Sequence, residues 1–270
     1  MSPLAELIAA GGVLVLSGAG MSTDSGIPDY RGPSGASLRR HAPMTYREFT
    51  SEPSARHRYW ARSHAGWPLM RRAEPNAGHR AVARLQDRGL VDAVITQNVD
   101  GLHQLAGSAG VIDLHGRLDR VACLDCATVV PRAAVEERLL AANTGWSATA
   151  GAHNPDGDVE LTDEQVQQFR MVDCERCGGP LKPDVVYFGE SVPRDRVAES
   201  YALVQRARSV VVLGSSLHVY SGRRFVQAAA DRGIPIAIVN RGATRAEHLA
   251  SIRLDMGIAQ ALAACDGVPA

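Results

Sequence analysis

The sequence predicts an α/β protein built on a doubly wound parallel sheet. Short apolar runs occur at 13–16, 93–95, 110–114, 210–213 and 236–239, and they have the length of buried parallel strands. The tripeptide Asp-Arg-Gly ends a helical pattern just before a strand at both 87–89 and 231–233. Helices and strands that alternate through short connections are typical of this architecture. We expect the run at 236–239 to be its last strand.

The helices are predicted from apolar residues spaced three and four apart. A short amphipathic helix opens the chain and ends at 11–12, another spans 76–87, and a third carries apolar residues at 197, 201 and 204 on one face. Residues 32–76 show no strand pattern. There we expect one helix from about 54 to 65, beginning after Pro53 and ending before Gly66-Trp67-Pro68.

The composition limits the class of protein. Basic and acidic residues balance at 29 each, so no net field attracts nucleic acid or an anionic membrane. No apolar run approaches the ~20 residues of a membrane span. Lys182 is the only lysine, which indicates a GC-rich bacterial genome, and the N-terminal residues lack the pattern of a signal or transit peptide. With five cysteines kept as reduced thiols, we expect a cytoplasmic bacterial protein without nucleic-acid or membrane partners.

Four of the cysteines form two Cys-x-x-Cys pairs, Cys123 with Cys126 and Cys174 with Cys177. This is the spacing of two zinc knuckles, separated by an insertion that includes a turn near 154–158. The alternative is four thiols unconnected in space. Because four thiolates leave no open coordination position, we expect one structural Zn²⁺ and no catalytic metal. Cys265 is left over and is expected to pack in the interior.

The sheet pattern is interrupted twice, which predicts the domain organisation. Residues 1–34, 76–118 and 183–270 form the large α/β domain in this prediction. A smaller inserted domain is made of a helical module at 35–75 and a four-cysteine zinc module at 119–182.

A glycine turn follows the first predicted strand directly. Gly18-Ala19-Gly20 comes after residue 17, and Ser22 or Thr23 can cap a short helix. Strand, glycine turn and helix N-terminus form the Rossmann-like arrangement in which backbone N–H groups receive a pyrophosphate. The signal is weak alone, because Thr23 stands where the Gly-x-Gly-x-x-Gly fingerprint has its third glycine.

Polar residues follow the strands at the edge where an α/β sheet binds ligands. The polar loop at 25–31 has the composition of a segment that folds over a cofactor, with an ordinary surface loop as the alternative. Thr96-Gln97-Asn98-Val99-Asp100 suits hydroxyl and carboxamide groups, although Asn98 or Asp100 can instead cap a helix. His115 ends the next strand and is a natural general base for a ribose hydroxyl. Small polar residues at 214–216 and 240–242 can admit an adenosine ribose, and each is also a good helix start.

Two of these stretches, Gly18-Ala19-Gly20-Met21-Ser22 and Ser25-Gly26-Ile27-Pro28-Asp29-Tyr30-Arg31, resemble the signature of sirtuins, the NAD-dependent protein deacylases. The resemblance covers nearly the whole chain, with every family motif in order. It implies NAD as co-substrate, and it implies catalytic roles for His115 and Asn98. For the cofactor it implies Gly18, Ala19, Gly20, Ser22, Ile27, Pro28, Asp29, Tyr30, Arg31, Gln97, Asn98, Val99, Asp100, Gly214, Ser215, Ser216, Asn240, Arg241, Gly242 and, by a looser match, Ile258.

The resemblance also implies where the substrate binds. We interpret 185–190 as a strand, and in sirtuins the end of this strand and the segment matching 217–220 hold an acyl-lysine peptide as an added strand. The residues implied are Val185, Tyr187, Phe188, Gly189 and Val219. Tyr59 and Arg62, on one face of the predicted helix, are similar to the Tyr-x-x-Arg pair with which some sirtuins read succinyl and malonyl groups. The alternative for Arg62 is a solvated helix face.

The expected reaction is removal of an acyl group from protein lysine, giving nicotinamide, free lysine and 2′-O-acyl-ADP-ribose. Tyr30, 145–147, 155–158 and 219–222 look most like the class II branch, that of mitochondrial sirtuin four. Protein mono-ADP-ribosylation or lipoamidase activity on the same scaffold is therefore an alternative. A non-catalytic module that binds NAD or acyl-peptides and an NAD-dependent dehydrogenase are further alternatives, both disfavoured by the motifs.

Overall fold

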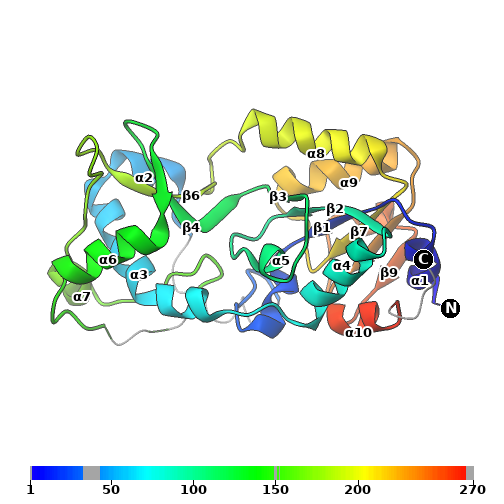
Figure 1. Cartoon of the computed structure of the whole chain (residues 1–270), viewed down its shortest axis with the longest axis horizontal. Coiled ribbons are helices and arrows are strands. Elements are labelled where there is room, and N and C mark those ends of the chain that lie inside the picture. The colour runs from blue at the N-terminus through cyan, green and yellow to red at the C-terminus, as the bar shows by residue number, and fades with distance from the viewer. Residues whose placement is uncertain (1, 33–42, 149–150, 152, 266–270) are drawn as a thin grey trace.

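A six-stranded parallel sheet forms the large lobe of the computed structural model, which describes residues 2–32, 43–148, 151 and 153–265 (Figure 1). Every neighbouring pair of strands in this sheet is parallel. The strand order is β3-β2-β1-β7-β8-β9, so the order reverses between β1 and β7. The strands are β1 (Val13–Ser17), β2 (Val91–Thr96), β3 (Val111–Asp113), β7 (Ser209–Leu213), β8 (Ile236–Val239) and β9 (Ile252–Leu254).

Helices cover both faces of this sheet, which confirms the predicted doubly wound fold (Figure 1). Side chains of β1 alternate between two hydrophobic cores, one on each face of the sheet. Val13 and Val15 belong to one core, and Leu14 and Leu16 belong to the other. One face carries α1 (Pro3–Ala9), α4 (Ala77–Asp87) and α10 (Ile258–Ala263), and the other α8 (Arg194–Arg206) and α9 (Tyr220–Asp231).

The small lobe contains an antiparallel sheet of order β5-β4-β6 and the helices packed on it (Figure 1). Its core surrounds Arg132, which is fully buried, donates to Glu136 and Ser63, and lies 4.9 Å from the ring centroids of both Trp60 and Trp67. The elements are α2 (Tyr46–Ser51), α3 (Pro53–Arg72), β4 (Gly116–Cys123), β5 (Val129–Pro131), α6 (Arg132–Ala142), α7 (Asp163–Gln168) and β6 (Leu181–Val185). The boundary that we placed between residues 34 and 35 lies outside the described residues.

Three predicted elements differ in the structure. Helix α3 continues through Gly66 and Pro68 to Arg72, because tertiary packing overrides the local signal. Gly66 is in such close contact that a Cβ there would lie 2.2 Å from the carbonyl oxygen of Gly157. Strand β6 ends at Val185, where the predicted strand began. The sheet has a further short strand, β9, after the run that we expected to be last.

The helix expected after the glycine turn is also absent. Two single 3₁₀ turns, η1 (Ala19–Met21) and η2 (Thr23–Ser25), stand in its place, and neither has a side-chain cap. The Ser22 hydroxyl donates instead to Asp100 Oδ2 at 2.7 Å, so the predicted capping role of Ser22 is wrong.

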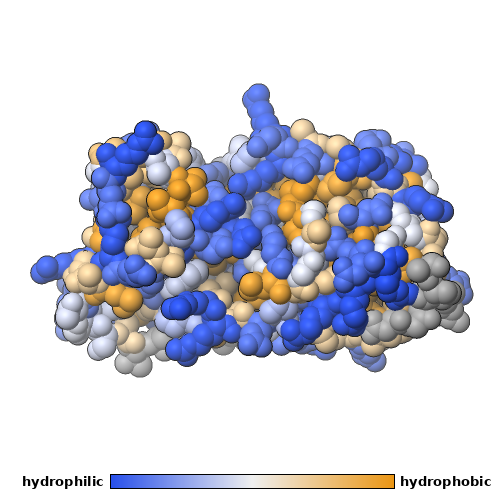
Figure 2. Space-filling view, viewed as in Figure 1, coloured by the Kyte–Doolittle hydropathy of each residue, from blue (hydrophilic) through white to orange (hydrophobic). Residues whose placement is uncertain are grey.

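The surface is mostly hydrophilic on the face shown in Figure 2, where apolar residues lie in separate groups over both lobes. Among the described residues, no helix combines the length and the apolar character that crossing a bilayer requires.

Two buried histidines lie behind the strand ends of the large lobe. His79 of α4 and His103 of α5 (Leu102–Leu105) are 0% and 1% exposed, and their ring centroids are 4.9 Å apart. His103 Nε2 lies 2.9 Å from Ser17 Oγ, which donates to Thr96 Oγ1. Burial lowers the pKa of His79 to about 3 and the pKa of His103 to about 4. Both side chains are therefore neutral in the folded protein at neutral pH.

This pair predicts that acid weakens the fold. Below the unfolded-state pKa of 6.5 the unfolded chain binds more protons than the native chain, so the free energy of unfolding falls with pH towards about 4. The stability is fully present above pH 6.5, and each histidine contributes a slope of about 1.4 kcal/mol per pH unit. Denaturant unfolding at several pH values measures it. We expect a smaller slope for His79→Gln and the wild-type slope for His248→Gln, a change at an exposed histidine. Equal slopes in all three proteins would contradict the interpretation.

Candidate functional site

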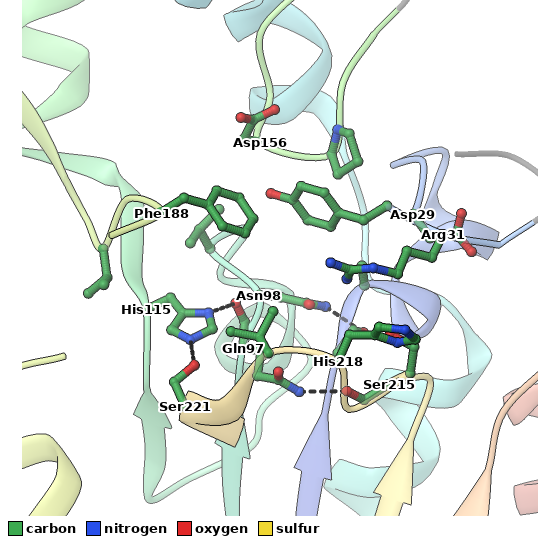
Figure 3. Close-up of a pocket in the computed structure, with 18 of the residues that line it drawn as sticks. Asp29, Arg31, Gln97, Asn98, His115, Asp156, Phe188, Ser215, His218 and Ser221 are labelled. Carbon is green, nitrogen blue, oxygen red and sulfur yellow. Dashed lines mark hydrogen bonds between the residues drawn. The ribbon is translucent and has the colours of Figure 1, made fainter. Parts of the chain in front are cut away.

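A cavity of about 1150 Å³ lies where the carboxyl ends of the large-lobe strands meet the small lobe (Figure 3). It is larger than the ~300–1,000 Å³ of most small-molecule pockets. Residues from both lobes line it. The predicted residues among them are Gly18, Ala19, Gly20, Ser22, Ile27, Asp29, Tyr30, Arg31, Tyr59, Gln97, Asn98, Val99, Asp100, His115, Val185, Tyr187, Phe188, Gly189, Gly214, Ser215, Ser216, Val219, Asn240, Arg241 and Gly242.

Three predicted site residues are not in the lining. Ile258 is 7% exposed, begins α10 and packs in the core beside Gly78. The contact with the adenine that the looser match implies for Ile258 stays a prediction. Pro28 belongs to the loop over the cavity but is not part of the lining. Arg62 is also absent from the lining.

The loops after β1 and β7 touch at the point where the strand order reverses. Gly20 donates its N–H to the Gly214 carbonyl at 2.9 Å, and a Cβ on Gly20 would lie 2.9 Å from Gly214 Cα. Gly214 itself has φ +64°, and a Cβ there would lie 2.4 Å from the Met21 nitrogen. Glycine is therefore required on both sides of the contact.

The same contact corrects the expected role of the glycine turn. The N–H groups of Gly18, Gly20, Met21 and Ser22 all donate to backbone carbonyls of the protein, with lengths from 2.8 to 3.1 Å. These four amides are consequently satisfied and do not form the expected cradle for a pyrophosphate. The glycines instead remove side-chain bulk, so that the floor of the cavity is formed by backbone.

The motif after β2 is held in a network of hydrogen bonds. Gln97 Nε2 donates to Ser215 Oγ at 2.8 Å, across the sheet. Asn98 Nδ2 donates to the Gly18 carbonyl at 3.1 Å and to Ser22 Oγ at 3.0 Å, and the Ser22 hydroxyl donates to Asp100 Oδ2. These side chains are thus fixed before any ligand arrives (Figure 3).

Asp100 has two partners, one on each carboxylate oxygen. While Oδ2 accepts from Ser22, Oδ1 accepts the N–H of Leu102, the first residue of α5, at 2.9 Å. Asp100 thus lines the cavity and also accepts from the first turn of α5, so its role towards a ligand stays a prediction. Burial raises the pKa of this carboxyl, and the hydrogen bonds from Ser22 and Leu102 oppose that rise.

The loop at 26–31 covers one side of the cavity. Ile27 is 4% exposed and belongs to the small-lobe core, which anchors the loop. Asn76 Nδ2 ties the preceding turn by donating to the Met21 carbonyl and Ser25 Oγ. In Figure 3 the Arg31 side chain reaches inward above His218, as expected for a loop that closes over a ligand. Arg31 is also one of the groups that lower the pKa of His218, after desolvation.

His115 is held at both ring nitrogens. Nδ1 lies 3.0 Å from the carbonyl oxygen of Gln97, and Nε2 lies 2.8 Å from Ser221 Oγ (Figure 3). Burial lowers the pKa of His115 to about 4, with Arg224 and Arg196 adding to the effect and the Gln97 carbonyl opposing it. The imidazole is therefore neutral at neutral pH and can accept a proton.

The sequence analysis missed several lining residues. Ser221, His218 and Arg224 come from α9 and the segment before it, and Asp156 comes from the turn near 154–158. Ser221 lies in a stretch that we used only to choose a family branch. No local pattern marks a serine at a helix start as the partner of a histidine 106 positions away.

The segment that we expect to bind the peptide lines the cavity as a turn and not as a strand. After β6 ends at Val185, Val186 donates its N–H to the His115 carbonyl at 2.8 Å, and Phe188 accepts from the N–H of Tyr46 at 2.9 Å. The buried side chain of Lys182 connects the two ends of this turn. It is 7% exposed, pairs with Glu190 at 3.1 Å and donates to the Val185 carbonyl at 2.5 Å.

Tyr59 and Arg62 do not form the expected acyl reader. Tyr59 lines the cavity, but the Arg62 guanidinium pairs with Asp158 at 3.0 Å and Glu160 at 3.1 Å, and Arg62 is not in the lining. All three of these charged side chains are at least 83% buried by this packing. The Arg62 guanidinium is therefore already neutralised by the protein's own carboxylates. Glu160 lies 98 positions further along the chain, and no local sequence pattern predicts this contact.

The four paired cysteines meet in the small lobe. Their sulfur atoms all lie within 4.8 Å of one another, with Cys123 Sγ 3.5 Å from Cys177 Sγ and Cys126 Sγ 3.8 Å from Cys174 Sγ. A tetrahedron of Zn–S bonds near 2.3 Å places its sulfurs ~3.8 Å apart, so the donor set fits one zinc ion. None of the five cysteines is in a disulfide, and Cys265 is buried in the large-lobe core as expected.

Comparison with protein families and curated proteins gives consistent matches. The model of the Sir2 family matches residues 18–221. A protein of Streptomyces coelicolor, NAD-dependent protein deacetylase 1, is 60% identical over 262 residues, covering 97% of this chain and 87% of the relative. An NAD-dependent protein deacetylase of Xanthomonas axonopodis pv. citri is 53% identical over 251 residues, covering 93% of this chain and 85% of the relative.

Solved structures match over the same extent. A Sir2 structure with a p53 peptide and NAD⁺ has a TM-score of 0.78 and 31% identity, covering 98% of this chain and 96% of that chain. A structure described as Sir2Tm bound to a propionylated peptide has a TM-score of 0.74 and 30% identity, covering 97% of this chain and 94% of that chain.

The cysteine cluster predicts that loss of one thiolate releases the metal. Cys177→Ser should leave an incomplete ligand set, which neither holds the ion nor orders the two knuckles, and thermal stability should fall. Metal analysis of protein purified under reducing, chelator-free conditions measures this. We expect one zinc per chain in the wild type and in Cys265→Ala, whose thiol lies outside the cluster, and none in Cys177→Ser. Wild-type protein without zinc would contradict the assignment.

Proposed function

The chain belongs to the Sir2 family, and we propose that it is an NAD-dependent protein-lysine deacylase. One observation carries the proposal. His115, the network of Gln97, Asn98 and Asp100, and the glycine contact at the reversal of the sheet all face one cavity. A neutral histidine beside preorganised amide and carboxylate groups suits chemistry on a ribose.

We assign the binding positions of the two ends of NAD from the side chains that line the cavity. Ser216 and Asn240 follow β7 and β8, where small polar side chains suit an adenosine ribose. Asn98 and Asp100 offer hydrogen-bonding groups for a carboxamide, and Ile27 offers an apolar surface beside them. The nicotinamide is therefore placed on the β2 side of the cavity and the adenosine on the β8 side.

The acyl-lysine enters from the side formed by Phe188 and Val219, which both line the cavity. Bound NAD supplies the reactive glycosidic bond, and the proposed products are nicotinamide, free lysine and 2′-O-acyl-ADP-ribose. His115 acts as the general base, because its neutral ring accepts a proton from the ribose hydroxyls. The apolar walls exclude water, which would otherwise compete for the activated ribose.

We assign the chain to the class II branch as part of this proposal. Tyr30, Pro155, Asp156, Val219 and Tyr220, which belong to the stretches that resemble this branch, all line the cavity. A preference for acidic acyl groups is no longer part of the proposal, because the Arg62 cation is bound by Asp158 and Glu160. The structure favours neutral acyl groups, since Tyr59, Tyr187 and the Asp156 carboxylate line the same space.

Product analysis tests the proposed reaction. With NAD and a panel of acyl-lysine peptides, mass spectrometry should detect free-lysine peptide together with acyl-ADP-ribose. His115→Ala should retain NAD binding and lose at least ~10²-fold in deacylation, the low end for a general base. Labelling of an acceptor protein with ADP-ribose in place of deacylation would support mono-ADP-ribosylation instead. If no substrate leads to release of nicotinamide, the non-catalytic binding module would be the remaining interpretation.

Arg62 provides a separate prediction about the acyl group. Arg62→Ala leaves Asp158 and Glu160 without their cation, so the free energy of unfolding should fall by about 3 kcal/mol. Turnover of acetyl and succinyl peptides should fall by the same factor, and the wild type should prefer acetyl. Arg58→Ala is the matched control, because Arg58 is exposed on the same helix. A selective loss of succinyl turnover in Arg62→Ala would restore the acidic-acyl interpretation.

A further inference from the structure

The hydrogen bonds of His115 determine which nitrogen is the base. The Gln97 carbonyl at 3.0 Å from Nδ1 can only accept, so Nδ1 carries the proton of the neutral ring. Nε2 therefore holds the lone pair, and the Ser221 hydroxyl at 2.8 Å donates to it. The atom that must accept the ribose proton is thus already occupied by a hydrogen bond from the protein.

Ser221 is itself a wall of the cavity. It is the second residue of α9, it is half-buried, and it lines the same space as His115. Figure 3 shows its hydroxyl directed at the imidazole from below, while the Gln97 carbonyl contacts the ring from the right. The oxygen that donates to His115 retains lone pairs that can accept a hydrogen bond from a ligand.

The start of α9 is packed too tightly for Ser221 to withdraw easily. A Cβ on the next residue, Gly222, would lie 2.6 Å from Gln97 Oε1, so this turn of α9 rests on the Gln97 side chain. Gln97 is in turn fixed by its hydrogen bond to Ser215 and holds the other nitrogen of His115 through its carbonyl. One residue therefore positions both sides of the His115–Ser221 pair.

We propose that Ser221 relays the proton from the NAD ribose to His115, an inference that rests on the deacylase function proposed above. The ribose O–H bond breaks as its proton passes to Ser221 Oγ, and the Ser221 proton passes to His115 Nε2. The ribose oxygen keeps the electron pair and forms the bond to the acyl carbon, while the π bond between that carbon and the lysine nitrogen breaks and its electron pair passes to the nitrogen. Ser221 ends as a neutral hydroxyl and His115 as an imidazolium with both nitrogens protonated, which later returns its proton to water.

Kinetics of three variants test the relay. Ser221→Ala should lower the rate of acyl-ADP-ribose formation at least ~10-fold, a part of the ~10²–10⁴ that a general base supplies. Ser221→Thr keeps the hydroxyl and should retain most of the rate. Because both residues act on one proton, Ser221→Ala combined with His115→Ala should be no slower than His115→Ala alone. Gln227→Ala, at an exposed position of the same helix, should match the wild type.

A measurement without NAD separates the relay from a merely structural role. The Ser221 hydroxyl can rotate, so it donates to the neutral ring and accepts from Nε2–H of the imidazolium. The bond to the charged ring is the stronger one, so Ser221→Ala should lower the pKa of His115 in a ¹⁵N-histidine NMR titration. The His115 signal is assigned by its absence in His115→Ala. Calorimetric affinity for NAD should fall at most ~10-fold in Ser221→Ala, which is the loss of one hydrogen bond to the ribose.

The outcomes distinguish the inference from the proposed function. Wild-type protein that never releases nicotinamide would remove the deacylase function itself. An active wild type with an equally fast or faster Ser221→Ala variant would overturn the relay and leave the function intact. Additive losses in the double variant, or an unshifted His115 pKa, would also overturn it.

Discussion

The reversal of strand order between β1 and β7 is the constraint on which the rest of the site depends. Chains leave the two neighbouring strands in opposite directions there, and a crevice opens above them. The crevice floor exists only because Gly20 and Gly214 allow two backbones to touch. Side chains at either position would push the loops apart and with them Ser215, which holds Gln97. The position of His115 therefore depends on a glycine contact that His115 itself does not touch.

Hydrogen bonds among the site residues make the cavity rigid before a ligand binds. Ser17 and Thr96 connect the buried histidines to the backbone N–H of Asn98, which donates to Thr96 Oγ1 at 3.1 Å. Asn98 then connects to Ser22, and Ser22 to Asp100. In a low-dielectric interior these hydrogen bonds hold the side chains in place, although His103 Nδ1 and His79 Nε2 have no partner among the described residues. Ligand binding consequently requires little reordering of these side chains, which favours a site that discriminates by shape.

The sequence was sufficient where the signal is local or where a motif repeats. Five of the six strands of the large sheet, helix α4 and the four-cysteine cluster all follow from spacing, and the structure contains them. Prediction failed where a distant segment decides. Helix α3 passes Gly66 and Pro68 because a remote turn packs on it, and Arg62 is neutralised by carboxylates 96 and 98 positions later. The amides of the glycine turn were likewise predicted to face a ligand. Their acceptors are carbonyl groups at the end of β7 and in the loops that follow β1 and β7, which no local pattern indicates.

Lys182 has a consequence that follows from its being the only lysine of the chain. Its amine lies beneath the Phe188 turn, paired with Glu190 and set against the rings of Tyr46 and Tyr187. Reactive acyl donors modify amines that are exposed and uncharged. This amine is buried and ion-paired, although burial lowers its pKa against the opposing effect of Glu190. A protein proposed to strip acyl groups from lysines thus offers no ε-amine of its own to such donors.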